Sequence, residues 1–285
     1  MLSFLNRIAR FNPSSFQFLQ TAAAGLLLGR AWQHLFWDAP YRELLWDEYW
    51  MRDIVANIFG LSWSDYVSNP IYDERIQLFI RGMGCFFGLS AAAAVGIKWV
   101  PRLARVMLCI SGAVLFLLAI LNWKEYSWQL GQLLEYTLQW ITPLLLAAIS
   151  SRSIPDFWIR YASRFAISAT FLGHGLYALG YYAVPGTFVE MTMRSLNIGE
   201  AAARNFLFVI GSLDVLAALG VVWPVRFKNT IFAYLVCWGL LTSFARVWSY
   251  FSFDFWENWL QMWVYELLMR FPHFLVPLFL WKNEK

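Results

Sequence analysis

The chain has 285 residues, of which 60% are hydrophobic and 14% charged, and its mean hydropathy is +0.50. A soluble domain of ordinary composition carries roughly a quarter charged residues, so this composition excludes one. The net charge of +4 comes from basic residues scattered over short loops, without the basic stripe typical of nucleic-acid binding. The apolar residues form long blocks, which is the pattern of membrane-spanning helices. We therefore predict an all-α membrane protein without a nucleic-acid partner.

The chain begins with a short segment that contains Arg7 and Arg10 but no cleavage-type site, and this predicts a retained cytoplasmic N-terminus. About eight apolar blocks follow, each close to the ~20 residues that cross a hydrocarbon core. They predict transmembrane helices at 16–37, 75–97, 103–123, 129–149, 159–183, 203–223, 228–250 and 256–281. Cys85, Cys109 and Cys237 stand singly inside these blocks, so we expect them to be small buried side chains without redox function.

The loop at 38–74, between the first two predicted helices, is the longest and is acidic. Within it, the stretch LLWDEYWMRDIVANIFGL has bulky apolar residues at helical spacing, so we expect an amphipathic helix on the outer membrane surface.

The basic residues of the loops set the expected orientation of the chain. Twelve fall on the side of the N-terminus: Arg7, Arg10, Lys98, Arg102, Arg105, Arg152, Arg160, Arg164, Arg226, Lys228, Lys282 and Lys285. Seven fall on the other side: Arg42, Arg52, Arg75, Lys124, Arg194, Arg204 and Arg246. Because Lys and Arg concentrate in cytoplasmic loops, we predict cytoplasmic N- and C-termini. We expect the membrane to be a bacterial-type inner (plasma) membrane.

An internal duplication is visible when 27–40 is laid over 171–185. The matched residues are Gly29 with Gly173 and Arg30 with His174, followed later by Gln139 with His273 and Pro143 with Pro277. Four crossings return a chain to its starting side, so two such halves form a parallel repeat. We predict a first four-helix unit at 1–153, including the long acidic loop, and a second at 154–285.

Ionisable residues inside the predicted helices are the candidate site. They are Arg30, His34, Arg81, Glu135, His174, Asp214, Glu266, Arg270 and His273. A charge in hydrocarbon costs at least ~2.5 kcal/mol, so such residues face a partner or a cavity. The direction of each helix places most of them toward the outer leaflet. All except His273 are candidate ligand-binding residues, and the alternative is that they only fasten helices together.

Spacing suggests particular partners and excludes some chemistries. We predict that Arg30 pairs with Glu135, that His174 pairs with Asp214, and that Glu266 shares a helix face with Arg270. The three histidines lie on three helices without HxxxH or ExxH spacing, which does not predict a metal site. A haem between facing histidines, His34 and His174, stays an open alternative. Phosphate-binding loops, dinucleotide fingerprints and nucleophile motifs are absent from the sequence.

The stretch FLGHGLYALG at 171–180, followed by a helix with Gly211 and Asp214, resembles the DoxX-like membrane families. The first half, with LLLGRAWQHLFWDAP at 26–40, is similar to the related DoxD and HTTM groups. The resemblance covers both halves and implies a tandem four-helix repeat. It singles out His174 and Asp214 as site residues and, by internal symmetry, Arg30. The catalytic lysine region of the HTTM-containing carboxylase has no counterpart, so carboxylation is not expected.

The resemblance and the outward polar cluster together predict a redox-associated subunit that binds a quinone or other isoprenoid near the outer leaflet. His174 would hydrogen-bond a ring oxygen, while Asp214 would hold its tautomer and Arg30 would supply positive charge. The alternative is a non-catalytic scaffold or accessory subunit of a larger membrane complex, docked through 38–74. A third possibility is a lipid-handling enzyme or transporter, but no interrupted pair of helices is evident to mark a substrate site. Membrane lipid and other membrane subunits are the expected partners, and whether the chain is an enzyme stays open.

Overall fold

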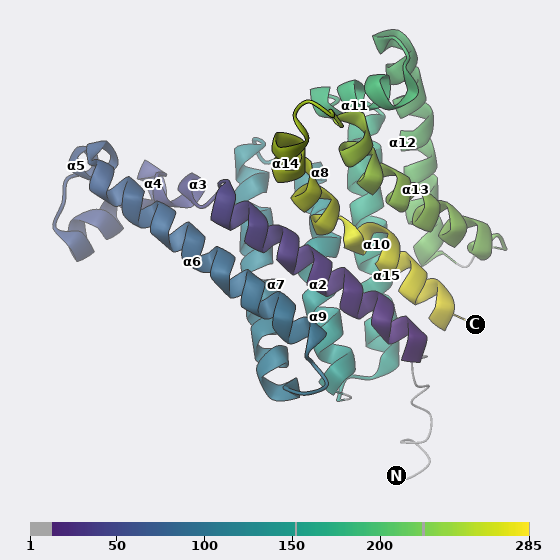
Figure 1. Cartoon of the computed structure of the whole chain (residues 1–285), viewed down its shortest axis with the longest axis horizontal. Coiled ribbons are helices and arrows are strands. Elements are labelled where there is room, and N and C mark those ends of the chain that lie inside the picture. Colours follow the sequence, from purple (N-terminus) through teal and green to yellow (C-terminus); the bar gives the residue numbers. More distant parts are fainter. Residues whose placement is uncertain (1–12, 152, 224–225, 285) are drawn as a thin grey trace.

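The computed structural model describes residues 13–151, 153–223 and 226–284, and within these ranges every regular element is helical (Figure 1). Four of the basic residues predicted on the cytoplasmic side, Arg7, Arg10, Arg152 and Lys285, lie outside the described residues. The longer helices are α2 (Pro13–Phe36), α6 (Pro70–Val95), α7 (Pro101–Glu125), α9 (Thr137–Ser151), α10 (Asp156–Ala178), α12 (Glu200–Val222), α13 (Lys228–Ser249), α14 (Trp256–Met269) and α15 (Phe271–Asn283). The shorter ones are α3 (Arg42–Leu45), α4 (Glu48–Ile54), η1 (Val55–Phe59), α5 (Trp63–Ser68), α8 (Leu130–Glu135) and α11 (Gly186–Leu196).

Five helical segments are long and apolar enough to cross a bilayer, which supports the prediction of a membrane protein. They are Pro70–Val95, Pro101–Glu125, Leu130–Ser151, Glu200–Val222 and Lys228–Ser249. α2 and α10 are of similar length, with 24 and 23 residues, and each carries several polar or charged residues. The start of α2 lies beside the end of α15, where the Ser15 hydroxyl donates to Asn283 Oδ1 at 3.2 Å.

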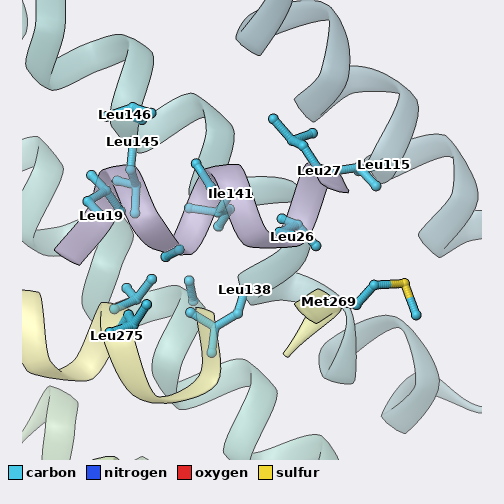
Figure 2. Packing of buried hydrophobic residues seen from close by; sticks show 14 of the residues in the cluster. Leu19, Leu26, Leu27, Leu115, Leu138, Ile141, Leu145, Leu146, Met269 and Leu275 are labelled. Carbon is cyan, nitrogen blue, oxygen red and sulfur yellow. The ribbon is translucent and has the colours of Figure 1, made fainter. Parts of the chain in front are cut away.

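The apolar core is centred on α2, which packs against α6, α9, α14 and α15. Figure 2 shows Leu19, Leu26 and Leu27 of α2 beside Ile141 and Leu145 of α9. Leu26 and Leu27 are fully buried, which is the environment of helices in the middle of a bundle rather than at its rim. Through α2 the two halves of the chain contact each other, because α14 and α15, which pack against it, come from the end of the sequence.

Two helices are interrupted, contrary to the expectation that none is. α8 ends at Glu135 and α9 begins at Thr137, and in the same way α14 ends at Met269 and α15 begins at Phe271. Pro143 and Pro277 follow inside α9 and α15. Proline has no backbone N–H and disturbs the turn before it, so a weakened helix is expected near both breaks. Each predicted single helix, 129–149 and 256–281, is therefore a broken pair.

The helix contacts of the first half recur in the second. α2 packs on α6 as α10 packs on α12, and α7 packs on α9 as α13 packs on α15. Across the halves, α2 contacts the broken pair α14–α15, and α10 contacts the broken pair α8–α9. Close-contact glycines recur with them. A Cβ on Gly112 would approach the carbonyl oxygen of Trp140, and one on Gly239 would approach that of His273.

The acidic loop forms an arm of short helices that extends from the bundle beside the start of α6 (Figure 1). Asp47 caps α4 by accepting from the Trp50 N–H at 3.0 Å, and the helix ends through η1 at Gly60, which has φ +65°. The expected amphipathic helix is thus present as α4 and η1. Most of its bulky apolar side chains are exposed, including Tyr49, Ile58 and Phe59, whereas Val55 is buried.

The cysteines correct one expectation about burial. Cys85, Cys109 and Cys237 are exposed on the outer sides of α6, α7 and α13 and are free thiols. The prediction that they are buried was wrong because it treated apolar segments as core segments. In a membrane helix the apolar face turned away from the protein meets lipid, so a small apolar side chain is placed there without cost.

Candidate functional site

A cavity of about 530 Å³ lies within the second half, between α10, α11, α12, α13 and the junction of α14 with α15. Its wall is mainly apolar and aromatic, with Phe171, Phe188, Phe206 and Trp238 among the lining residues. Five ionisable residues line it as well: His174, Asp214, Arg246, Arg270 and His273. An apolar wall with a few convergent polar groups is the usual composition of a site for a small organic ligand.

One side of the cavity is bordered by residues on the outer surface of the helices. Leu241, Phe244 and Trp248 of α13 line the cavity and are also exposed. In a bilayer, this side of α13 faces hydrocarbon, because α13 is one of the helices long and apolar enough to span a membrane. The cavity therefore has a buried polar end and an apolar border at the lipid-facing surface.

Two arginines at the polar end share a single carboxylate. Glu266 Oε2 lies 3.2 Å from Arg246 Nε and 3.1 Å from Arg270 Nη1. The contact with Arg246 is close, but its Nε–H does not point at the oxygen well enough for a hydrogen bond. The predicted pairing of Glu266 with Arg270 is confirmed. Arg246 was counted among outer-loop residues, and this placement was wrong, since it is a buried residue of α13.

His174 is paired with a residue from the first half of the chain. Its Nδ1 lies 2.8 Å from Glu135 Oε1, at the end of α8, although the N–H direction is poor for a hydrogen bond. The ring of His174 lies beside that of His273, with centroids 5.5 Å apart. Glu135 therefore pairs with His174, and the predicted pair of Arg30 with Glu135 does not form. The interruption after Glu135 places this carboxylate beside α10.

Asp214 lines the cavity from α12 and is almost fully buried. Its Oδ1 accepts a hydrogen bond from the hydroxyl of Tyr234 at 2.7 Å. His174 and Asp214 thus line the same cavity, as the sequence suggested, but each has another direct partner. Tyr234 carries no charge and sits in an apolar stretch, which is why the sequence did not single it out.

The first half of the chain contains a separate buried polar cluster around Arg30. Arg30 donates to Gln139 Oε1 at 2.5 Å and to Gln33 Oε1 at 2.8 Å, and it packs over the ring of Tyr136. The His34 ring packs against Phe87, which is fully buried, with centroids 5.0 Å apart.

Of the remaining candidates, His34 and Arg81 lie apart from the cavity lining. His34 Nδ1 contacts the carbonyl of Arg30 at 2.7 Å and its Nε2 contacts the Tyr41 hydroxyl at 3.2 Å. Both ring nitrogens are therefore occupied, which removes His34 as a haem ligand. Arg81 is exposed on α6. Across the described ranges, no group of three or more His, Cys, Asp or Glu side chains is arranged to hold a metal ion.

No protein family model, curated protein or solved structure matches the chain. The resemblance to the DoxX-like families therefore stays a prediction drawn from the motifs at 26–40 and 171–180.

The cavity offers both donors and acceptors to a ligand's polar end. Guanidinium groups donate only, a carboxylate accepts, and a neutral imidazole does each through one nitrogen. These groups lie at the buried end of an otherwise apolar space, so a ligand that satisfies both environments is amphipathic.

Proposed function

We propose that the chain is a membrane protein that binds one isoprenoid-type amphiphile, a quinone or a related isoprenoid, in the cavity of its second half. The observation that carries this proposal is the union of an apolar wall, an exposed apolar border and a polar end that contains His174, Arg246 and Arg270. The polar head would lie against these three residues. The tail would leave past Leu241, Phe244 and Trp248 toward the bilayer.

The proposal includes an arrangement of eight crossings as two parallel four-helix units. α2, α6, α7 and the α8–α9 pair would form one unit, and α10, α12, α13 and the α14–α15 pair the other. Support comes from the recurring helix contacts and from two glycine pairs, Gly84 with Gly211 and Gly112 with Gly239, each 127 positions apart. Each member of these pairs sits where a Cβ would meet a neighbouring helix. Such close approach is typical of small residues between membrane helices.

Interrupted helices at corresponding places also favour ligand binding. In membrane transporters, a broken helix pair places free backbone groups and helix ends at a buried site. Here one break lies at Arg270 and contributes to the cavity, and the other lies at Tyr136 beside Arg30. In this account the cavity lies toward the outer leaflet, with both termini on the cytoplasmic side.

The direct test is the identity of small lipophilic molecules that co-purify with the full chain in mild detergent, measured by mass spectrometry. We expect one isoprenoid at near-stoichiometric amount in the wild type. Ala245→Trp, which fills the cavity from α13, should lose it, whereas the exposed Arg81→Ala should retain it. Equal recovery of the molecule from Ala245→Trp would show that it binds elsewhere.

The arm supports a second candidate, a subunit of a larger membrane complex. It extends from the bundle and exposes aromatic and aliphatic side chains, including Tyr49, Trp50 and Ile58 (Figure 1). Exposed apolar patches of this kind are typical of contacts with protein or membrane. Recovery of a stoichiometric protein partner that is lost from Tyr49→Ser/Ile58→Ser would favour this candidate. Recovery of the wild-type chain alone after gentle extraction would oppose it.

A further inference from the structure

The polar end of the cavity contains more guanidinium donors than the protein satisfies. Arg246 is only 8% exposed, yet in the part of the chain that the structure describes its only close anionic contact is Glu266, through Nε. Arg270 uses Nη1 for both the carbonyl and the carboxylate of the same Glu266. A buried donor left without an acceptor costs about 1–3 kcal/mol, and more when it is charged. Among the described residues, Arg246 Nε is the one fully buried N–H of these two arginines without a hydrogen bond. The other N–H groups of Arg246 and Arg270 are available to an acceptor that enters the cavity.

The duplicated half shows that the fold does not need these two arginines. At the offset of 127 that relates Gly112 to Gly239, the counterpart of Arg246 is Ala119, a fully buried residue of α7. At the offset of 134 that relates Pro143 to Pro277, the counterpart of Arg270 is Tyr136. The same helix contacts thus form with neither guanidinium present. One buried and one half-buried guanidinium that packing does not require are best explained by a ligand.

We propose that the head group in this cavity is an oxyanion of the phosphate type, carried on the isoprenoid tail and held by Arg246 and Arg270. This inference rests on the proposed function and narrows its ligand class. Guanidinium groups bind phosphate oxygens through paired, directional N–H contacts, and a phosphate offers enough acceptor oxygens for two arginines. A neutral quinone offers two separate carbonyl oxygens and no charge.

Other features of the cavity agree with an anionic head. His174 and His273 line the same end and add ring nitrogens as donors. Glu266 does not line the cavity, so its charge lies behind the arginines rather than beside the ligand. Asp214 does line it, but its contact is with the hydroxyl of Tyr234 at 2.7 Å and not with either arginine.

The test compares four probes on the full chain in nanodiscs of neutral lipid: a polyprenyl phosphate, the polyprenol of the same tail, a ubiquinone, and inorganic phosphate. We expect the polyprenyl phosphate to bind at least about tenfold tighter than polyprenol or ubiquinone, because its phosphate gains a few charge-assisted hydrogen bonds from the arginines. Arg246→Gln should remove most of this preference, while binding of polyprenol changes little. The exposed Arg81→Gln is the control and should behave as wild type.

The outcomes separate the failure of this inference from the failure of the proposed function. Equal binding of polyprenol, ubiquinone and polyprenyl phosphate, unaffected by Arg246→Gln, overturns the oxyanion head but keeps the isoprenoid site. Binding of no isoprenoid at all overturns both. Binding of inorganic phosphate as tight as that of polyprenyl phosphate overturns the lipid as the source of the oxyanion. Should Arg246→Gln fold poorly, Arg246→Lys tests the same point, since it keeps the charge and loses the paired contact.

Discussion

Glu266→Gln tests the charge arrangement at the cavity, because one side-chain oxygen of Glu266 serves two arginines at 3.2 Å and 3.1 Å. The amide keeps the shape but removes the only carboxylate that lies close to Arg246 among the described residues. Breaking a buried ion pair costs about 3–5 kcal/mol, and the Glu266 side chain is 25% exposed, so we expect the lower end of this range. For a chain of this size, a loss of ~3 kcal/mol corresponds to a fall of roughly 6–12 °C in melting temperature.

The assay is the melting temperature followed by fluorescence-detected size-exclusion chromatography, with Glu48→Gln as a matched control. Glu48 pairs with Arg52 on an exposed helix face, where such a pair contributes less than about 1 kcal/mol. If the head group is an oxyanion, Glu266→Gln should also bind polyprenyl phosphate more tightly than wild type does, since a competing negative charge is gone. Equal stability of Glu266→Gln and Glu48→Gln would refute the reasoning. It would mean that Glu266 does not balance the two arginines.

Three further predictions concern packing, pH and lipid exposure. A Cβ on Gly239 would lie 2.5 Å from the backbone oxygen of His273, so Gly239→Ala should lower the free energy of unfolding by about 2 kcal/mol, even after the gain in helix propensity. A Cβ on Gly82 would meet nothing within 4 Å, so Gly82→Ala should be neutral or stabilising in the same melting assay. Lys124 donates to Asp47 at 2.6 Å and holds the pKa of this carboxyl below its ordinary value of 3.8. Because the folded pKa of Asp47 is depressed, its stabilisation of the arm is complete above pH 3.8 and is lost as pH falls through the lower folded pKa. Pepsin should therefore cut the wild-type arm faster as pH drops. Asp47→Asn should show no such pH dependence. Cys85, Cys109 and Cys237 should resist a charged maleimide in membranes, where a thiol against hydrocarbon stays protonated, and should react with it after unfolding in SDS; fast reaction in intact membranes would contradict their contact with lipid.

Much of the helix pattern could be predicted because the apolar blocks are long and are separated by turn signals. For example, α7 begins at Pro101, within the loop that the sequence predicts between two apolar blocks. The interruptions at Tyr136 and Arg270 could not be predicted with the same ease. Each lies within a mainly apolar block, where Pro143 and Pro277, two turns later, are compatible with an unbroken membrane helix. Pro272, in the first turn of α15, is the one start signal near the second break.

The sequence predicted which residues line the cavity better than it predicted which of them contact each other. Intramembrane charge alone selects His174, Asp214 and Arg270, because the cost of burying a charge does not depend on the fold. Partner choice depends on how helices from the two halves meet, and this is why Glu135 of the first half pairs with His174 of the second. Arg246 was missed as a site residue because it lies near the end of a predicted helix, where a basic residue usually reaches the membrane surface.

Photocrosslinking in native membranes tests the central claim, an isoprenoid-type ligand in the cavity, most directly. A photoreactive amino acid would replace Ile210, which lines the cavity, or Leu213, which lies on the exposed surface of the same helix. The account predicts that the Ile210 variant captures one defined isoprenoid species and that the Leu213 variant captures only bulk lipid. Capture of the same mixture of bulk lipids at both positions would contradict the account.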